Sequence, residues 1–109
     1  MMFGVNGPLI DEIVQILSSN VKVKKAVVFG SRARGDYQKS SDLDIALFAE
    51  PSLSSQELNR MRHEIEELNT ILKIDLLDVD RVAKAPLLEN ILREGIIIYD
   101  KSANRPRKE

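Results

Sequence analysis

Residues 30–47 read GSRARGDYQKSSDLDIAL, and this stretch decides how the chain folds. It follows an apolar run, residues 26–29, of the kind found in strands that are covered on both faces. A polar segment comes next, with room for one short helical turn and a loop, and a second strand pattern occupies residues 42–49. Because the connection is too short for a crossover helix, we expect the two strands to be antiparallel.

Outward from this stretch, helical and strand patterns alternate. A first helix begins at Pro8, since proline suits a first helical turn, and the S-x-x-E capping box of Ser54 and Glu57 begins a second. Residues 73–79 read as a third strand, and residues 96–99 read as a short final one. A last helix starts at Pro86 and is expected to stop at a left-handed glycine, Gly95. The side chains predicted to face the core at helical spacing are Leu9, Ile10, Ile13, Val14 and Leu17, then Leu58, Met61, Ile65, Leu68 and Leu72, then Leu87, Leu88, Ile91 and Leu92.

This order of elements predicts an α/β fold with a small mixed β-sheet flanked by helices. The 109 residues fit one compact domain, which we assign to residues 1–100. Residues 101–109, with basic side chains at Arg105, Arg107 and Lys108, are interpreted as a basic mobile tail.

Composition excludes several classes of protein. The chain has no cysteine, which excludes a disulfide scaffold and a thiolate metal site and favours a reducing cytoplasm. We see no signal peptide and no apolar run near the ~20 residues of a membrane span, so no membrane contact is expected. With 16 basic and 17 acidic residues the net charge is -1, which argues against direct nucleic-acid binding.

Candidate chemistry begins with Asp42 and Asp44. Residues two apart on a strand point to the same face, so the two carboxylates project side by side. Adjacent anions repel each other, and a cation between them relieves the repulsion; carboxylate oxygens suit Mg²⁺. Taken alone, such a pair is more often two solvated side chains at a strand entrance.

A third carboxylate, Asp75, lies within the apolar strand pattern of residues 74–77. A buried charge there costs several kcal/mol unless it is paired or metal-bound. Asp78 faces the opposite way by period-two alternation, and we assign it to solvent or to a loop cap. The alternative for Asp75 is a structural, hydrogen-bonded carboxylate.

Gly30 and Ser31 form the third part of the candidate site. Glycine allows close backbone approach to a phosphate, exposed N–H groups attract anions, and the Ser31 hydroxyl adds a donor. Arg34 can be interpreted as a further phosphate ligand or as a solvated loop arginine. A plain turn remains the alternative for the pair. Together with the carboxylates, however, the turn predicts a metal–nucleotide site for phosphoryl or nucleotidyl transfer.

The combined spacing, G-S-x10-D-x-D, resembles the signature of the DNA polymerase beta-like nucleotidyltransferases. Residues 30–47, with the later segments KIDLLD and ILREGIIIY, closely resemble the minimal nucleotidyltransferases, or MNT proteins, of that superfamily. The similarity runs from about Val23 to Tyr99.

The resemblance implies a nucleotidyltransferase fold and a set of roles. Asp42, Asp44 and Asp75 correspond to the family's catalytic and metal-binding aspartates, and Gly30 and Ser31 to its nucleotide-phosphate turn. It also implies Mg²⁺, ATP as substrate, and AMP transfer to a tyrosine hydroxyl of a helical HEPN-domain ribonuclease toxin. The chain would then be the antitoxin of a hetero-oligomeric pair.

Two alternatives stay open at this stage. The first is a binding module of the same fold that neutralises its partner by contact alone. The second is nucleotidyl transfer to a small molecule or to RNA, which we disfavour because no segment is left over to grip such an acceptor. No residue of the sequence identifies the nucleotide base.

Overall fold

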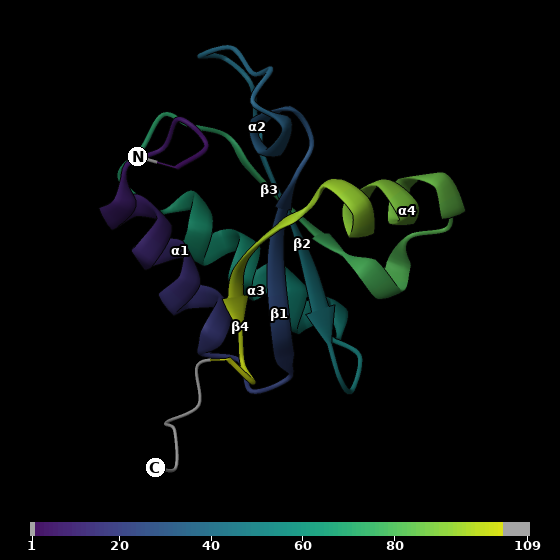
Figure 1. The fold of residues 1–109 in the computed structure, drawn as a ribbon. Helices are drawn as coiled ribbons and strands as arrows, with labels where there is room; N and C mark the ends of the chain where they lie inside the picture. Colours follow the sequence, from purple (N-terminus) through teal and green to yellow (C-terminus); the bar gives the residue numbers. More distant parts are fainter. Residues whose placement is uncertain (1, 104–109) are drawn as a thin grey trace, which may run out of the picture.

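A four-stranded sheet organises the computed structural model, which describes residues 2–103 (Figure 1). Its strand order is β3-β2-β1-β4; β1 runs antiparallel to β2 and β4, whereas β2 and β3 are parallel. The predicted mixed sheet and the antiparallel pairing of the first two strands are therefore confirmed. In chain order the elements are α1 (Gly7–Ser18), β1 (Val23–Phe29), α2 (Ser31–Arg34), β2 (Leu43–Ala49), α3 (Ser55–Glu66), β3 (Ile74–Asp78), the 3-10 turn η1 (Val79–Arg81), α4 (Ala85–Glu94) and β4 (Ile96–Asp100).

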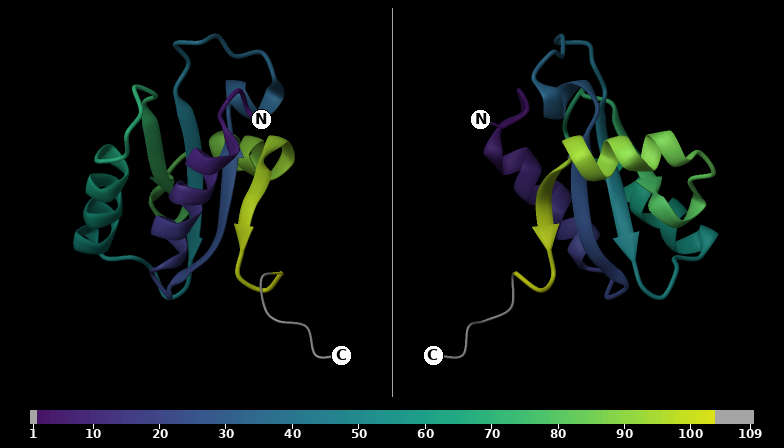
Figure 2. Two further views of the ribbon diagram at one scale, coloured as in Figure 1. Left: turned by 90° about the vertical axis from the view of Figure 1, so that its left-hand side faces the viewer. Right: turned by 45° about the vertical axis from the view of Figure 1, so that its right-hand side comes forward.

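The helices divide between the two faces of this sheet, as the two views of Figure 2 show. Alternate residues of β2, at Leu43, Ile45 and Leu47, are fully buried in the larger core cluster with side chains of α1 and α3. The intervening Ala46 packs on the other face against Ile91 of α4. Because each fully buried Leu or Ile contributes roughly 1.5–3 kcal/mol, the α1/α3 face supplies most of the stability.

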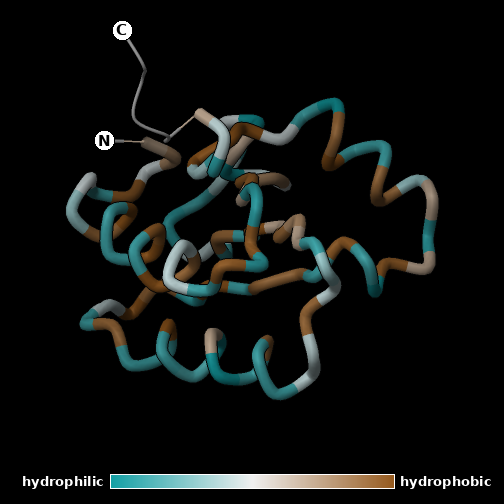
Figure 3. Tube along the Cα trace, turned by 90° about the horizontal axis from the view of Figure 1, so that it is seen from below, coloured by the Kyte–Doolittle hydropathy of each residue, from teal (hydrophilic) through white to brown (hydrophobic). Residues whose placement is uncertain are grey.

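The hydropathy of the chain follows the same division. Figure 3 shows hydrophobic segments along the central strands, whereas the outer helices alternate between hydrophilic and hydrophobic colours. This alternation is the period expected when one stripe of a helix is buried. The sheet is thus the structural core on which a site can be held rigidly.

Side chains cap two of the three predicted helix starts: the predicted capping box begins α3, and Asn6, which the sequence analysis did not single out, caps α1. The Ser54 hydroxyl accepts a hydrogen bond from the Glu57 backbone N–H at 3.1 Å, and the Glu57 carboxylate accepts one from the Ser54 N–H at 2.9 Å. The capping box of α3 is therefore confirmed. At α1, Pro8 lies in the first turn and the Asn6 side chain caps the Leu9 N–H at 2.8 Å.

Three details of the sequence interpretation are wrong. Gly95 is extended, with φ -67° and ψ 147°, and not left-handed; glycine is needed there because a Cβ would overlap the Val27 side chain and the Ile91 carbonyl. Leu92 is 62% exposed, since α4 packs on the sheet through Ile91 and Leu87 instead. Helix α3 ends at Glu66, so Leu72 reaches the core from the segment that follows.

Residues 2–103 contain no helix with both the length and the apolar character to cross a bilayer. The start of the predicted tail is attached to the sheet, because the Lys101 backbone N–H donates to the Lys24 carbonyl of β1 at 2.8 Å. The basic residues Arg105, Arg107 and Lys108 lie outside the described part of the chain.

Candidate active site

The turn at Gly30 and Ser31 connects β1 to the single helical turn α2 (Figure 1). Gly30 has φ 80° and ψ -156°, a conformation essentially restricted to glycine. A Cβ at this position would lie 2.7 Å from Oδ2 of Asp44. The glycine therefore lets the turn and the Asp44 carboxylate approach each other directly, which links two predicted parts of the site.

Asp44 and Asp75 are direct neighbours across the sheet. They are register partners in the parallel ladder between β2 and β3, and register partners point to the same face. Asp42 immediately precedes β2, two residues before Asp44. The structure thus brings the side chains of Asp44 and Asp75 to one face, as the sequence predicted.

The electrostatics of Asp44 connect all three carboxylates. Burial raises the pKa of the Asp44 carboxyl, and the charges of Asp75 and then Asp42 raise it further. The three anions are therefore close enough to repel one another, and a divalent cation would relieve that repulsion. Within residues 2–103, no group of three or more acidic, histidine or cysteine side chains is arranged to enclose a metal ion. The carboxylates converge without forming a closed cage.

The expected burial of the two β3 carboxylates is reversed. Asp75 is exposed because β3 is an edge strand and its α4-side face is open at that position. Asp78 is buried, at 2% exposure, and its carboxylate accepts hydrogen bonds from the Asp80 N–H and the Arg81 Nε, both at 3.1 Å. The loop cap predicted for Asp78 is correct, whereas the solvent position is wrong.

A cleft of about 430 Å³ opens beside Asp44 and Asp75. Phe29, Leu77 and Leu87 supply its apolar wall. At its rim lie Arg62 and Glu66 of α3, where the Arg62 guanidinium donates to the Leu76 carbonyl on the outer edge of β3 at 3.0 Å. Sequence analysis did not identify Arg62 and Glu66, because charged residues on the outer face of an amphipathic helix normally indicate only solvation.

The two arginines of α2 have different environments. Arg34 is on the surface, where its guanidinium contacts the carboxylates of Asp36 at 3.2 Å and Glu94 at 3.4 Å, and its pKa is raised, chiefly by the hydrogen bond to Asp36. Arg32, by contrast, is buried and donates to backbone carbonyls. The segment Ser31–Arg34 contains both arginines without distinguishing them, so sequence reasoning missed the buried one.

Comparison with protein families and with named proteins adds independent findings. Residues 11–104 match the family described as polymerase beta, nucleotidyltransferase. A Methanocaldococcus jannaschii protein named as a protein adenylyltransferase is 35% identical over 75 residues, 68% of this chain and 77% of that protein. The protein adenylyltransferase MntA of Haemophilus influenzae is 38% identical over 50 residues, 46% of this chain and 44% of that protein.

Solved structures share the fold. A toxin–antitoxin crystal structure with AMP-PNP aligns with a TM-score of 0.71 and 22% identity, over 87% of this chain and 76% of that chain. A structure of a tri-AMPylated Shewanella oneidensis HEPN toxin in complex with MNT antitoxin aligns with a TM-score of 0.66 and 18% identity, over 89% and 74%. At these identities the likeness establishes the fold alone.

Proposed function

Because this chain belongs to the polymerase beta nucleotidyltransferase family, we propose that it transfers AMP from ATP to a hydroxyl of a partner protein, with Mg²⁺. The observation that supports this most strongly is the arrangement of Asp44 between Asp75 and the glycine turn. Asp44 is the register partner of Asp75, and its Oδ2 lies where a side chain on Gly30 would begin. A phosphate-binding turn and a pair of carboxylates thereby share one surface.

Each residue has a role in this proposal. Asp42 and Asp44 would hold Mg²⁺ against the triphosphate, and Asp75 would share a second ion with one of them. Bound there, the metal neutralises phosphate charge in the transition state. The Ser31 hydroxyl and the backbone N–H groups of the turn donate to the phosphate oxygens, with Arg34 as a further donor. Asp75 orients the acceptor hydroxyl and receives its proton, while the bond from Pα to the acceptor oxygen forms and the bond to pyrophosphate breaks.

The acceptor that fits best is a tyrosine of a HEPN-domain ribonuclease toxin, with the chain acting as its antitoxin in a hetero-oligomer. Two relatives are named as protein adenylyltransferases, and one structure of the same fold contains a tri-AMPylated HEPN toxin. The cleft beside Asp75 has an apolar wall, which suits a phenol ring. We place the reaction in the cytoplasm, since a cysteine-free chain suits a reducing compartment.

Label transfer from ATP to a co-expressed HEPN toxin tests this function. With Mg²⁺, wild type should label a toxin tyrosine, and Asp42→Ala/Asp44→Ala should lower the rate by roughly 10³-fold or more, as expected when the groups that stabilise phosphoryl charge are removed. Asp11→Ala, at an exposed carboxylate of α1, is the matched control and should transfer normally. Absence of labelling by wild type with Mg²⁺ present would contradict the proposal.

One observation favours a second function, neutralisation by binding alone. The carboxylates of residues 2–103 form no closed metal-binding group. The same double variant separates the two functions in an assay of toxin ribonuclease activity. Full inhibition by Asp42→Ala/Asp44→Ala would establish the binding module, whereas loss of inhibition supports catalysis.

A further inference from the structure

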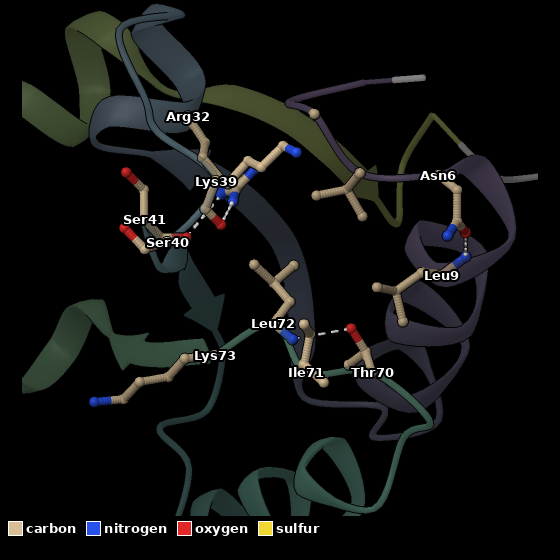
Figure 4. A pocket seen from close by; sticks show the side chains of 12 residues that line it. Asn6, Leu9, Arg32, Lys39, Ser40, Ser41, Thr70, Ile71, Leu72 and Lys73 are labelled. Carbon is tan, nitrogen blue, oxygen red and sulfur yellow. Dashed lines mark hydrogen bonds between the residues drawn. The ribbon is translucent and has the colours of Figure 1, made fainter.

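A second pocket, of about 440 Å³, lies at the same end of the sheet but on the face covered by α1 (Figure 4). Five segments meet around it: the chain before α1, the first turn of α1, Arg32 of α2, residues 39–41 and residues 70–73. It does not include Gly30, Asp42, Asp44 or Asp75, so it is separate from the proposed transfer site. The proposed reaction does not use this pocket.

The charged side chains lining this pocket are all cationic: Arg32, Lys39 and Lys73. Arg32 is only 4% exposed, and its guanidinium donates to the carbonyls of Phe3 at 2.8 Å and Ser41 at 3.0 Å, with longer contacts to those of Gln38 and Lys39. Within residues 2–103, none of these three cations takes part in a salt bridge. Backbone carbonyls satisfy donors but do not neutralise a charge, so the pocket keeps a positive potential.

The neutral polar side chains of the pocket are left as donors. Oδ1 of Asn6 accepts from the Leu9 N–H at 2.8 Å, which leaves the Asn6 amide hydrogens free to donate. Oγ1 of Thr70 accepts from the Leu72 N–H at 3.1 Å, and Oγ of Ser41 accepts from the Gln38 N–H at 2.9 Å. Each hydroxyl therefore retains its own hydrogen for a ligand. The first turn of α1, which contains no acidic residue, adds the positive end of a helix dipole.

The remaining wall is apolar. Val5 and Leu9 are buried, Leu72 is half-buried, and Ile71 is fully exposed at the mouth. The free donors and the positive charge suit an oxyanion. The apolar wall suits a hydrophobic group attached to that oxyanion. A phosphate monoester matches better than a carboxylate, because it has three terminal oxygens and a larger charge for several separate donors.

We propose that this pocket is a binding site for a small organic phosphate, with the phosphate beside Lys39, an apolar body against Leu9 and Leu72, and Thr70 as a donor on the opposite side of the pocket (Figure 4). The site is independent of AMP transfer, since it uses none of the transfer residues. It assigns a function to Lys39 and Thr70, which the reaction does not use.

NMR titration of the ¹⁵N-labelled full chain with phenyl phosphate tests the site. The amide signals of Leu9, Thr70 and Leu72 should shift saturably, while those of Leu77 and Leu87 in the carboxylate-lined cleft should not. Lys39→Glu should weaken binding by about tenfold or more, because it replaces a charge-assisted contact with repulsion. Thr70→Val should weaken it by a few fold. Lys24→Glu, an equal charge reversal at the opposite end of β1, should leave binding unchanged.

Other outcomes would overturn the proposal. If phenol caused the same shifts as phenyl phosphate, the pocket would be an apolar site without selectivity for anions. If inorganic phosphate bound as tightly as phenyl phosphate, the apolar wall would not contribute to binding. Shifts confined to Ser31 and Asp44 would place the ligand in the transfer site. Binding that survives Lys39→Glu and Thr70→Val unchanged, in variants whose spectra remain folded, would also contradict it.

Discussion

Two pockets of nearly equal volume, about 430 and 440 Å³, lie at the same end of the sheet and differ mainly in charge. The first, on the α4 side, contains Asp44 and Asp75, whereas the second, on the α1 side, is lined by Arg32, Lys39 and Lys73 and by no acidic residue. The net charge of -1 conceals this separation. Charge therefore indicates function here only when it is located on the folded chain.

The segment from Ser31 to Asp42 connects the proposed transfer site to the cationic pocket. Its ends are Ser31 and Asp42 on the transfer side, and the adjacent residues, Arg32 and Ser41, line the cationic pocket. The Nε of Arg32 donates to the Ser41 carbonyl at 3.0 Å, which joins the two ends of the loop. Arg32 therefore contacts both ends of this segment, and we expect its substitution to have the largest effect.

Arg32→Met should break both pockets together. It leaves buried carbonyls, including those of Phe3 and Ser41, without donors, and we expect a loss of about 3 kcal/mol in the free energy of unfolding. Urea denaturation measures this, and both AMP transfer and phenyl phosphate binding should fall. Arg32→Lys keeps the charge but loses the planar fork, so it should recover little of the stability. Wild-type stability in Arg32→Met would show that the hydrogen bonds from Arg32 to these carbonyls do not stabilise the fold.

Gly30→Ala should damage the carboxylate side alone. Alanine would be strained at φ 80° and would crowd Oδ2 of Asp44, so we expect a cost of roughly 1–3 kcal/mol and a large loss of transfer. The control is Gly7→Ala, because nothing lies within 4 Å of a Cβ there. Phenyl phosphate binding should persist in folded Gly30→Ala. Normal transfer by this variant would argue against close contact between the turn and Asp44.

Asp44→Asn should change how the melting temperature depends on pH, an effect that we expect only at the carboxylate-lined cleft. Burial and the charges of Asp75 and Asp42 raise the pKa of Asp44, so the folded chain binds the Asp44 proton more tightly than the unfolded chain does. Asp44 therefore supports the fold at low pH and loses that contribution as the pH rises through its raised pKa. The variant should melt a few degrees above wild type at neutral pH without Mg²⁺, and the difference should vanish in acid. An equal melting temperature across this range would mean that the carboxylates do not repel.

The smallest effect is expected away from both pockets, at Glu57. Hydrogen bonds from the Lys22 ammonium and then the Ser54 N–H lower the pKa of Glu57 to about 2. Its contribution to stability is present above the ordinary value of 4.5 and is lost as the pH falls from there through about 2. Because the side chain is solvent-accessible, salt should weaken the effect. In Glu57→Gln the free energy of unfolding should fall slightly less steeply as the pH is lowered. Glu89→Gln on α4 should show the same pH dependence as wild type.

Much of the fold could be predicted because local signals are strong along this chain. The capping box, the two prolines and the short connection before Asp42 each fix one feature independently of the rest of the molecule. Gly95 was misassigned because glycine serves two purposes, a left-handed turn or close packing, and only the position of Val27 decides between them. Such long-range contacts cannot be predicted from the local sequence.

The candidate site could be predicted in part, in its residues but not in their burial. Spacing identified the turn and the carboxylates, and period-two alternation separated Asp75 from Asp78. Burial was inverted for that pair, since no local pattern reveals that β3 is an edge strand. Arg32 and Arg62 were missed because their partners are backbone carbonyls of distant segments, at Phe3 and Leu76.

The most direct test of the account is AMP transfer, per folded molecule, by Asp75→Asn and Asp78→Asn. The two aspartates share one strand and one chemistry but face opposite sides of the sheet, and only Asp75 is the register partner of Asp44. Asp75→Asn should lose transfer by about 100-fold or more and should not melt earlier than wild type, because it removes repulsion with Asp44 rather than a stabilising contact. Asp78→Asn should melt earlier, since it loses its ion pair with Arg81, yet transfer AMP normally while folded. Full transfer by Asp75→Asn, or loss confined to Asp78→Asn, would contradict the three-aspartate site.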